Sequence, residues 1–165
     1  LTPNVDLRLS ANQLQAIGLL SARWSYFETE MNFTISALGE LVENDQSVPY
    51  RHKDRTKRWR KLAGEFFKSP KVYIEIDHII TDSKTLHDAR CTILHSKVYR
   101  SRQSNQMTVE THRHLGDIWR IEVGHITTKE IKRAVQEIKQ LTISLISFNQ
   151  RHLPISPGSL PKRYP

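Results

Sequence analysis

The sequence is poor in the residues on which several common classes of protein depend. It has a single cysteine, Cys91, so neither an intrachain disulfide nor a zinc finger built on cysteines can form. It has only six glycines and no glycine-rich loop for nucleotide phosphates, which argues against a kinase, an ATPase or a dehydrogenase. No apolar run reaches the roughly 18 residues of a membrane span, so we expect no integral membrane protein. We predict no bound cofactor, and the lone cysteine fits a cytoplasmic protein.

Basic residues, in contrast, are abundant. The 165-residue chain has 25 Lys and Arg against 17 Asp and Glu, a net charge of +8. Such a balance favours a polyanionic partner. The excess is concentrated in residues 51–61, where one acid, Asp54, faces seven cations: Arg51, Lys53, Arg55, Lys57, Arg58, Arg60 and Lys61. This cluster predicts an RNA-binding surface, with an acidic protein partner or a merely solvated helix face as the alternatives.

Apolar residues recur at steps of three and four in four segments, which predicts four helices. We place these helices at 12–44, 51–68, 71–100 and 128–150. Ser69 and Pro70 are typical of a helix start, and Thr127 and Glu130 form a capping box. A strand over 72–80 is the alternative for part of the third segment, because β-branched residues are frequent there.

The apolar pattern changes to strict alternation over residues 105–123, which predicts a β-hairpin whose turn contains Gly116. The proline-rich residues 154–165 are typical of an unpacked, disordered tail. The sequence therefore predicts a mainly α protein. We expect one domain over residues 1–153, a four-helix bundle with a β-hairpin inserted between the third and fourth helices.

One charged residue interrupts the apolar stripe of the third predicted helix. At 100° per residue, Arg90 falls among the residues that should be buried. A guanidinium cannot lose its charge, so it needs a carboxylate, a phosphate or a water-filled cleft beside it. Glu28 and Glu30 of the first helix are candidate partners, and a structural Arg–Glu ion pair is one interpretation. His95 falls about 140° around the same helix from Arg90 and carries an imidazole that titrates near neutral pH.

Histidines also raise the question of a metal site. His87, Cys91 and His95 follow one another at intervals of four, with Asp88 nearby, and could line one flank of a helix. A straight helix rarely closes a site with three ligands over two turns, so we predict no metal. A cluster of His112, His114 and His125 around the hairpin is an equally weak alternative.

The segment from Arg90 to His95 is similar to the R-x4-H motif of the HEPN superfamily, a group of helical bundles that includes many ribonucleases. Trp24 to Glu28 on the first helix resembles the W-x-x-Φ-E segment of bacterial HEPN-like proteins, where Φ is apolar. The order of elements over residues 12–150 is similar as well. The superfamily usually has a polar residue such as Asn after the arginine and often glycine after the histidine, whereas this chain has Cys91 and Ser96.

The resemblance implies metal-independent RNA cleavage by a bacterial defence or toxin–antitoxin protein. In that interpretation His95 is the general acid or base, Arg90 stabilises the charge on phosphate, and Glu28 orients Arg90. The resemblance also implies a homodimer with a composite pocket, and a partner antitoxin or other acidic protein. The alternative is a non-catalytic partner-binding or regulatory module in which Arg90 is a structural ion-pair residue.

Overall fold

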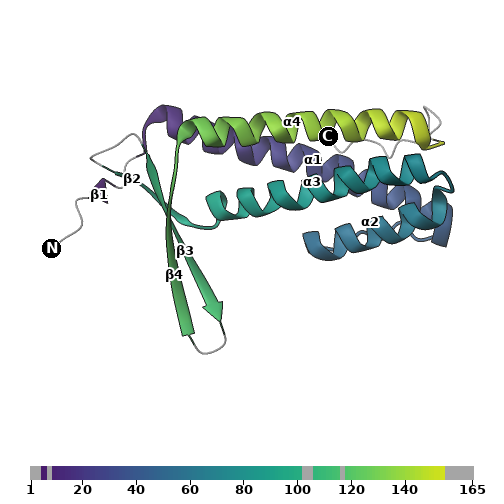
Figure 1. The fold of residues 1–165 in the computed structure, drawn as a ribbon, viewed down its shortest axis with the longest axis horizontal. Coiled ribbons are helices and arrows are strands. Elements are labelled where there is room, and N and C mark those ends of the chain that lie inside the picture. The colour runs from purple at the N-terminus through teal and green to yellow at the C-terminus, as the bar shows by residue number, and fades with distance from the viewer. Residues whose placement is uncertain (1–4, 7–8, 102–105, 116–117, 155–165) are drawn as a thin grey trace. The chain divides into compact units, whose positions relative to one another are not determined.

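The computed structural model describes residues 5–6, 9–101, 106–115 and 118–154 (Figure 1). Residues 155–165 of the predicted tail lie outside these residues. In chain order the helices are α1 (Ala11–Glu43), α2 (His52–Phe66), α3 (Pro70–Leu94) and α4 (Thr128–His152). The strands are β1 (Val5–Asp6), β2 (Lys97–Ser101), β3 (Met107–Leu115) and β4 (Ile118–Ile126). The fold is mainly α with a β-hairpin between the third and fourth helices, as the sequence predicts.

The sheet is larger than the predicted hairpin. Its described strands run in the order β1-β2-β3-β4, and every neighbouring pair is antiparallel. The prediction of a helix up to residue 100 was wrong, because α3 ends at Leu94 and Lys97 begins β2. Val98 and Tyr99 have high strand propensity, and their backbones pair with Val109 and Thr108 of β3. The tertiary pairing therefore overrides the helical spacing that extends beyond the end of α3.

The chain divides into two compact units, and each contains parts of α1, α3 and α4. The first unit comprises residues 1–27 and 83–140. Its core joins the first part of α1 to the end of α3, to β3 and to the first part of α4. The buried apolar residues are Ala16, Leu20, Trp24, Phe27, Leu86, Ile93, Met107, Val109, Ile131, Ala134, Val135 and Ile138.

The second unit comprises residues 28–82 and 141–165, and its described part is a bundle of four helical segments. Its core contains Met31, Ile35, Leu38, Trp59, Leu62, Ala63, Ile76, Ile79, Ile80, Leu141, Leu145, Phe148 and Leu153. A buried polar pair joins α1 to α4 in this core, since the Asn149 amide donates to the Thr34 hydroxyl at 2.9 Å. The pair is satisfied, which a buried polar group requires.

Local signals place most of the helix ends correctly. The capping box is present, since the Thr127 backbone N–H donates to Glu130 at 2.7 Å and the Glu130 N–H donates to the Thr127 hydroxyl at 3.1 Å. At the start of α1, Ser10 and Gln13 form a second capping box. This cap buries Gln13, whereas Leu14, the first apolar residue of the helix predicted at 12–44, is 57% exposed.

The end of α1 depends on a glycine. Asn44 adopts a left-handed backbone with φ of 52°, and Asp45 donates its N–H back to the Gly39 carbonyl at 3.2 Å. The Asn44 N–H also donates to the Glu40 carbonyl at 3.2 Å, which is the αL arrangement of a helix end. A Cβ atom on residue 39 would lie 2.2 Å from the Asp45 carbonyl oxygen, so only glycine fits there.

Candidate functional site

Arg90 and His95 are in direct contact in the first unit. The Arg90 Nη1 lies 3.1 Å from the His95 Nε2. Arg90 is half-buried and His95 is exposed. A guanidinium only donates hydrogen bonds, so Nε2 of His95 must accept and the imidazole must be neutral while this bond exists. The two side chains therefore place a permanent cation and an imidazole side by side in one site.

The end of α3 explains how these side chains meet. On a continuous helix they would point about 140° apart. The helix instead ends at Leu94, and His95 follows it with its backbone N–H still donating to the Cys91 carbonyl at 3.0 Å. His95 is therefore at a helix terminus, where its side chain can reach back to Arg90. A second protomer is not needed to bring this one pair together.

No carboxylate among the described residues pairs with Arg90. Its Nη1 also lies 3.8 Å from the Cys91 sulfur, and its Nε is buried without a hydrogen-bond partner. The remaining nitrogen, Nη2, has no described partner. A permanent cation of this kind, neither neutralised nor fully buried, is available to an anion.

The residues around the pair fix the end of α3. The Cys91 sulfur lies 3.5 Å from the His87 Nε2, and the His87 ring packs on Trp24 of α1 with centroids 5.5 Å apart. Ser96 and Thr111 share a hydrogen bond of 2.6 Å between their hydroxyls, which joins the end of α3 to β3. The two positions that depart from the HEPN motif, Cys91 and Ser96, thus both make local contacts. The sequence gives no signal for the Ser96–Thr111 bond.

Glu28 has a different partner from the one predicted. Its carboxylate accepts a hydrogen bond of 2.7 Å from the Arg55 Nη2, within the second unit. Arg55 also donates to Asn32 at 3.1 Å, and its side chain is only 11% exposed. The sequence places Glu28 and Arg55 on different helices, and only the packing of those helices shows that they pair. Glu28 of α1 therefore pairs with Arg55 of α2, and we give it no role beside Arg90.

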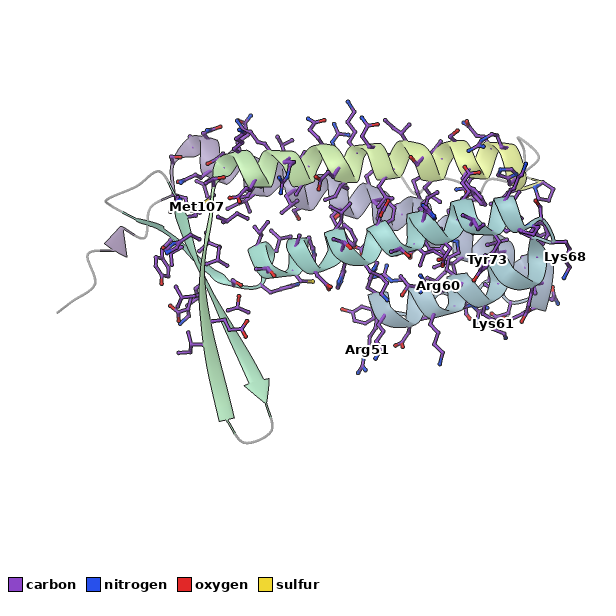
Figure 2. All side chains as sticks on the ribbon, viewed as in Figure 1. Arg51, Arg60, Lys61, Lys68, Tyr73 and Met107 are labelled. Atoms are coloured by element: carbon purple, nitrogen blue, oxygen red, sulfur yellow. The ribbon has the colours of Figure 1, made fainter. Side chains whose placement is uncertain are left out.

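The seven cations predicted to bind RNA fall into two groups. Four of them pair with carboxylates on neighbouring helices or on the segment after α1. The pairs are Arg55 with Glu28, Arg58 with Glu43 and Asp45, Arg60 with Asp77, and Lys61 with Glu43. Figure 2 shows Arg60 directed from α2 toward α3. These four residues attach α2 to the rest of the second unit.

The other three cations are Arg51, Lys53 and Lys57. All three are exposed, and none has an acidic partner among the described residues. Arg51 stands at the N-terminal end of α2 and is directed outward (Figure 2). Tyr50, which precedes it, is 97% exposed, whereas Trp59 is fully buried in the core. The surface open to a polyanion is therefore smaller than the charge of the segment implies.

The described residues contain no group of three or more His, Cys, Asp or Glu side chains placed to hold a metal ion. The side chains of His112 and His114 lie outside the described set, and exposed His125 lies 3.4 Å from the Thr108 hydroxyl. In the described part of the chain, no helix combines the length and apolar character that membrane crossing requires. Comparisons with protein-family models, curated proteins and solved structures find no match to this chain.

Proposed function

We propose that this chain is a HEPN-like, metal-independent endoribonuclease of a bacterial defence or toxin–antitoxin system, which works as a homodimer in the cytoplasm. One observation carries the proposal: an unneutralised, half-buried arginine donates to the free nitrogen of an exposed histidine at 3.1 Å. The resemblance to the R-x4-H motif is the reason for proposing the HEPN superfamily. The contact between the two side chains gives a physical reason for the spacing of the arginine and the histidine in that motif. The proposed catalytic residues are Arg90 and His95.

The chemistry needs only these two side chains and the substrate. The neutral His95 accepts the proton of a ribose 2′-hydroxyl. The 2′-oxygen then attacks the adjacent phosphorus, the bond from phosphorus to the 5′-oxygen breaks, and Arg90 stabilises the added negative charge. The products are a 2′,3′-cyclic phosphate and a 5′-hydroxyl, whose proton comes from water or from a second imidazole. DNA is not cleaved by this route because it lacks the 2′-hydroxyl.

Substrate binding must interrupt the hydrogen bond that the structure shows. While Arg90 donates to His95 Nε2, that nitrogen cannot accept another proton. A phosphate oxygen is a stronger, charged acceptor for the guanidinium than a neutral imidazole. The phosphate therefore draws Arg90 away and frees His95 only when a substrate is present.

The exposed cations of α2 supply a second part of the proposal. We assign RNA-backbone contact to Arg51, Lys53 and Lys57, because they carry charge that no described carboxylate offsets. Arg55, Arg58, Arg60 and Lys61 were predicted to share this role, but their charges are already used within the protein. An acidic protein partner, such as an antitoxin, would use the same three cations.

Cleavage of a single-stranded RNA in the presence of EDTA tests the catalytic role. We expect Arg90→Ala and His95→Ala each to lower the rate by about 10²–10³-fold, a usual cost of removing a charge-stabilising group or a general base. An RNA with a single 2′-deoxy nucleotide should resist cleavage at that position. Product ends analysed by mass spectrometry should carry the cyclic phosphate.

Matched controls come from the same kinds of residue elsewhere. His78 is exposed on α3, and Arg133 is 73% exposed on α4, so His78→Ala and Arg133→Ala should cleave as well as wild type. If the wild-type protein cuts no RNA, or if either site variant retains full activity, the enzyme proposal is wrong. The chain is then better described as the non-catalytic partner-binding module.

A further inference from the structure

Tyr50 is the most exposed large apolar or aromatic residue in the described part of the second unit. It is 97% exposed, whereas the next such residue in that unit, Ile74, is 54% exposed. Between residues 44 and 69, all of which the structure describes, no other large apolar or aromatic residue is exposed. An isolated ring of this kind does not form the contiguous apolar patch on which a protein partner usually docks.

The backbone on both sides of Tyr50 is fixed by hydrogen bonds. On one side, the Asp45 carboxylate accepts hydrogen bonds from the Ser47 backbone N–H at 2.9 Å and from Arg58 at 2.7 Å. On the other side, Arg51 has an extended backbone, and its carbonyl accepts two N–H hydrogen bonds from the first turn of α2, at 3.0 and 2.9 Å. The ring is thus carried by an ordered segment, which reduces the entropy lost when a ligand binds.

Exposed cations follow Tyr50 in the chain. Arg51 is the next residue, at the start of α2, and is directed outward (Figure 2). Lys53 and Lys57 lie four residues apart on α2, so their side chains are neighbours on one face of the helix. All three cations are exposed and have no acidic partner among the described residues. Tyr50, Arg51, Lys53 and Lys57, which we call the Tyr50 surface, therefore combine an exposed ring with three positive charges.

We propose that the Tyr50 surface binds single-stranded RNA in preference to a duplex, with the ring of Tyr50 stacked on an unpaired base. The inference rests on the proposed function, which assigns the three cations to the RNA backbone, and it adds what selects the form of the RNA. Aromatic rings beside basic side chains hold single strands because every base has a face on which a ring can stack. In a duplex the bases already stack on one another, so the ring has no base face to contact.

Binding of a strand that cannot be cleaved tests this inference separately from the proposed catalysis. The probe is a fluorescein-labelled single strand of 2′-deoxyribonucleotides, and fluorescence anisotropy measures its affinity for the full chain. We expect Tyr50→Ala to weaken binding by about 5- to 150-fold, the cost of one lost stacking contact. Tyr50→Phe keeps the ring and should bind as wild type does. The salt dependence should be the same in Tyr50→Ala, because a neutral ring releases no counterions.

A strand of abasic sites identifies what the ring contacts. This strand keeps the phosphates and lacks the bases, so Tyr50→Ala should bind it as tightly as wild type does. A duplex of the probe sequence should also bind both proteins equally, and wild type should bind it less tightly than the single strand. Tyr26→Ala, at a tyrosine of the first unit that is 47% exposed, is the matched control and should not change any of these affinities. Because Tyr50 is almost fully exposed, its replacement should leave the fold intact.

Several results would overturn the inference. Wild type could fail to bind single strands, or Tyr50→Ala could bind them equally well. An equal loss of affinity for the abasic strand would show that the ring does not contact a base. Polyglutamate that displaces the probe as effectively as an unlabelled strand of equal charge would make an acidic protein the better ligand. Since none of these probes is cleaved, each result is independent of the cleavage assay for Arg90 and His95.

Discussion

The cations of α2 and the single cation Arg90 differ in how the fold uses their charge. Of the seven basic side chains at 51–61, four pair with carboxylates, and these four attach α2 to α1, to α3 and to the segment that follows α1. Arg90 has no described carboxylate beside it and contacts a ring nitrogen of His95 instead. A dense cluster of charge therefore serves largely to hold the structure together, whereas one isolated arginine stays available for an anion.

This difference has a physical basis in the cost of removing each group. An arginine that satisfies a half-buried carboxylate leaves that carboxylate unpaired when it is deleted. An arginine with no such partner leaves nothing behind. Removal of an arginine that pairs with a carboxylate should therefore lower stability, whereas removal of an arginine without such a partner should mainly affect binding.

The largest effect on stability is expected at Arg55. Arg55→Ala leaves Glu28 and Asn32 without their donor and should lower the free energy of unfolding by about 1–3 kcal/mol. Arg90→Ala should cost less than about 1 kcal/mol, because its buried Nε has no partner to lose. Urea unfolding of both variants measures the difference, with exposed Lys57→Ala as the neutral reference. Equal losses at Arg55 and Arg90 would contradict the comparison.

A smaller effect, on RNA affinity, separates the two groups within α2. The triple variant Arg51→Ala, Lys53→Ala, Lys57→Ala should reduce the salt dependence of single-strand binding by about 2 in log–log slope, at about 0.7 per phosphate contact. Fluorescence anisotropy at several salt concentrations provides the measurement. The control replaces three exposed lysines elsewhere, Lys84, Lys129 and Lys139. A control that lowers the slope as much would show that net charge, rather than this surface, binds RNA.

The smallest effect is the acid sensitivity of the ion pair between Arg58 and Asp45. Hydrogen bonds from the Ser47 backbone and hydroxyl, followed by one from Arg58, hold the pKa of Asp45 below its ordinary value of 3.8. The native state thus favours the ionised carboxylate. Its contribution to stability is present above pH 3.8 and is lost as the pH falls through the lower native value.

Asp45→Asn should therefore flatten the loss of stability below pH 3.8 and leave its pH dependence near neutrality unchanged. Thermal unfolding across pH 2–7, an approximate range chosen to bracket that pKa, measures this effect. Asp54→Asn, an exposed substitution in the first turn of α2, is the control. A steeper acid limb in Asp45→Asn would mean that the carboxylate destabilises the native state.

Patterns within a few residues predicted much of the fold. The six inner positions of α4, from Ile131 to Phe148, are all buried as the spacing indicates. Pro70 is the first residue of α3, and the capping box of Thr127 and Glu130 marks the start of α4. These features depend on the chain's own helical geometry, which repeats every few residues and is therefore visible in the sequence.

The end of α3 and the partners of the charged residues were not predictable in the same way. Residues 97–101 keep an apolar spacing compatible with a helix, yet they pair with β3. Arg55 and Glu28 are 27 residues apart, and no local pattern joins them. The candidate site was found from the apolar stripe because a permanent charge there is conspicuous, but its contact with His95 depends on where the helix stops.

The sequence by itself determined four helices, their buried faces, a hairpin and the position of one anomalous arginine, because these follow from periodicity and from short-range hydrogen bonds. Only the tertiary structure decided which cations are neutralised, where α3 ends and that Arg90 meets His95. Charge pairing and strand pairing join residues far apart in the chain. Their outcome depends on which surfaces the folded helices and strands bring within a few ångströms of each other.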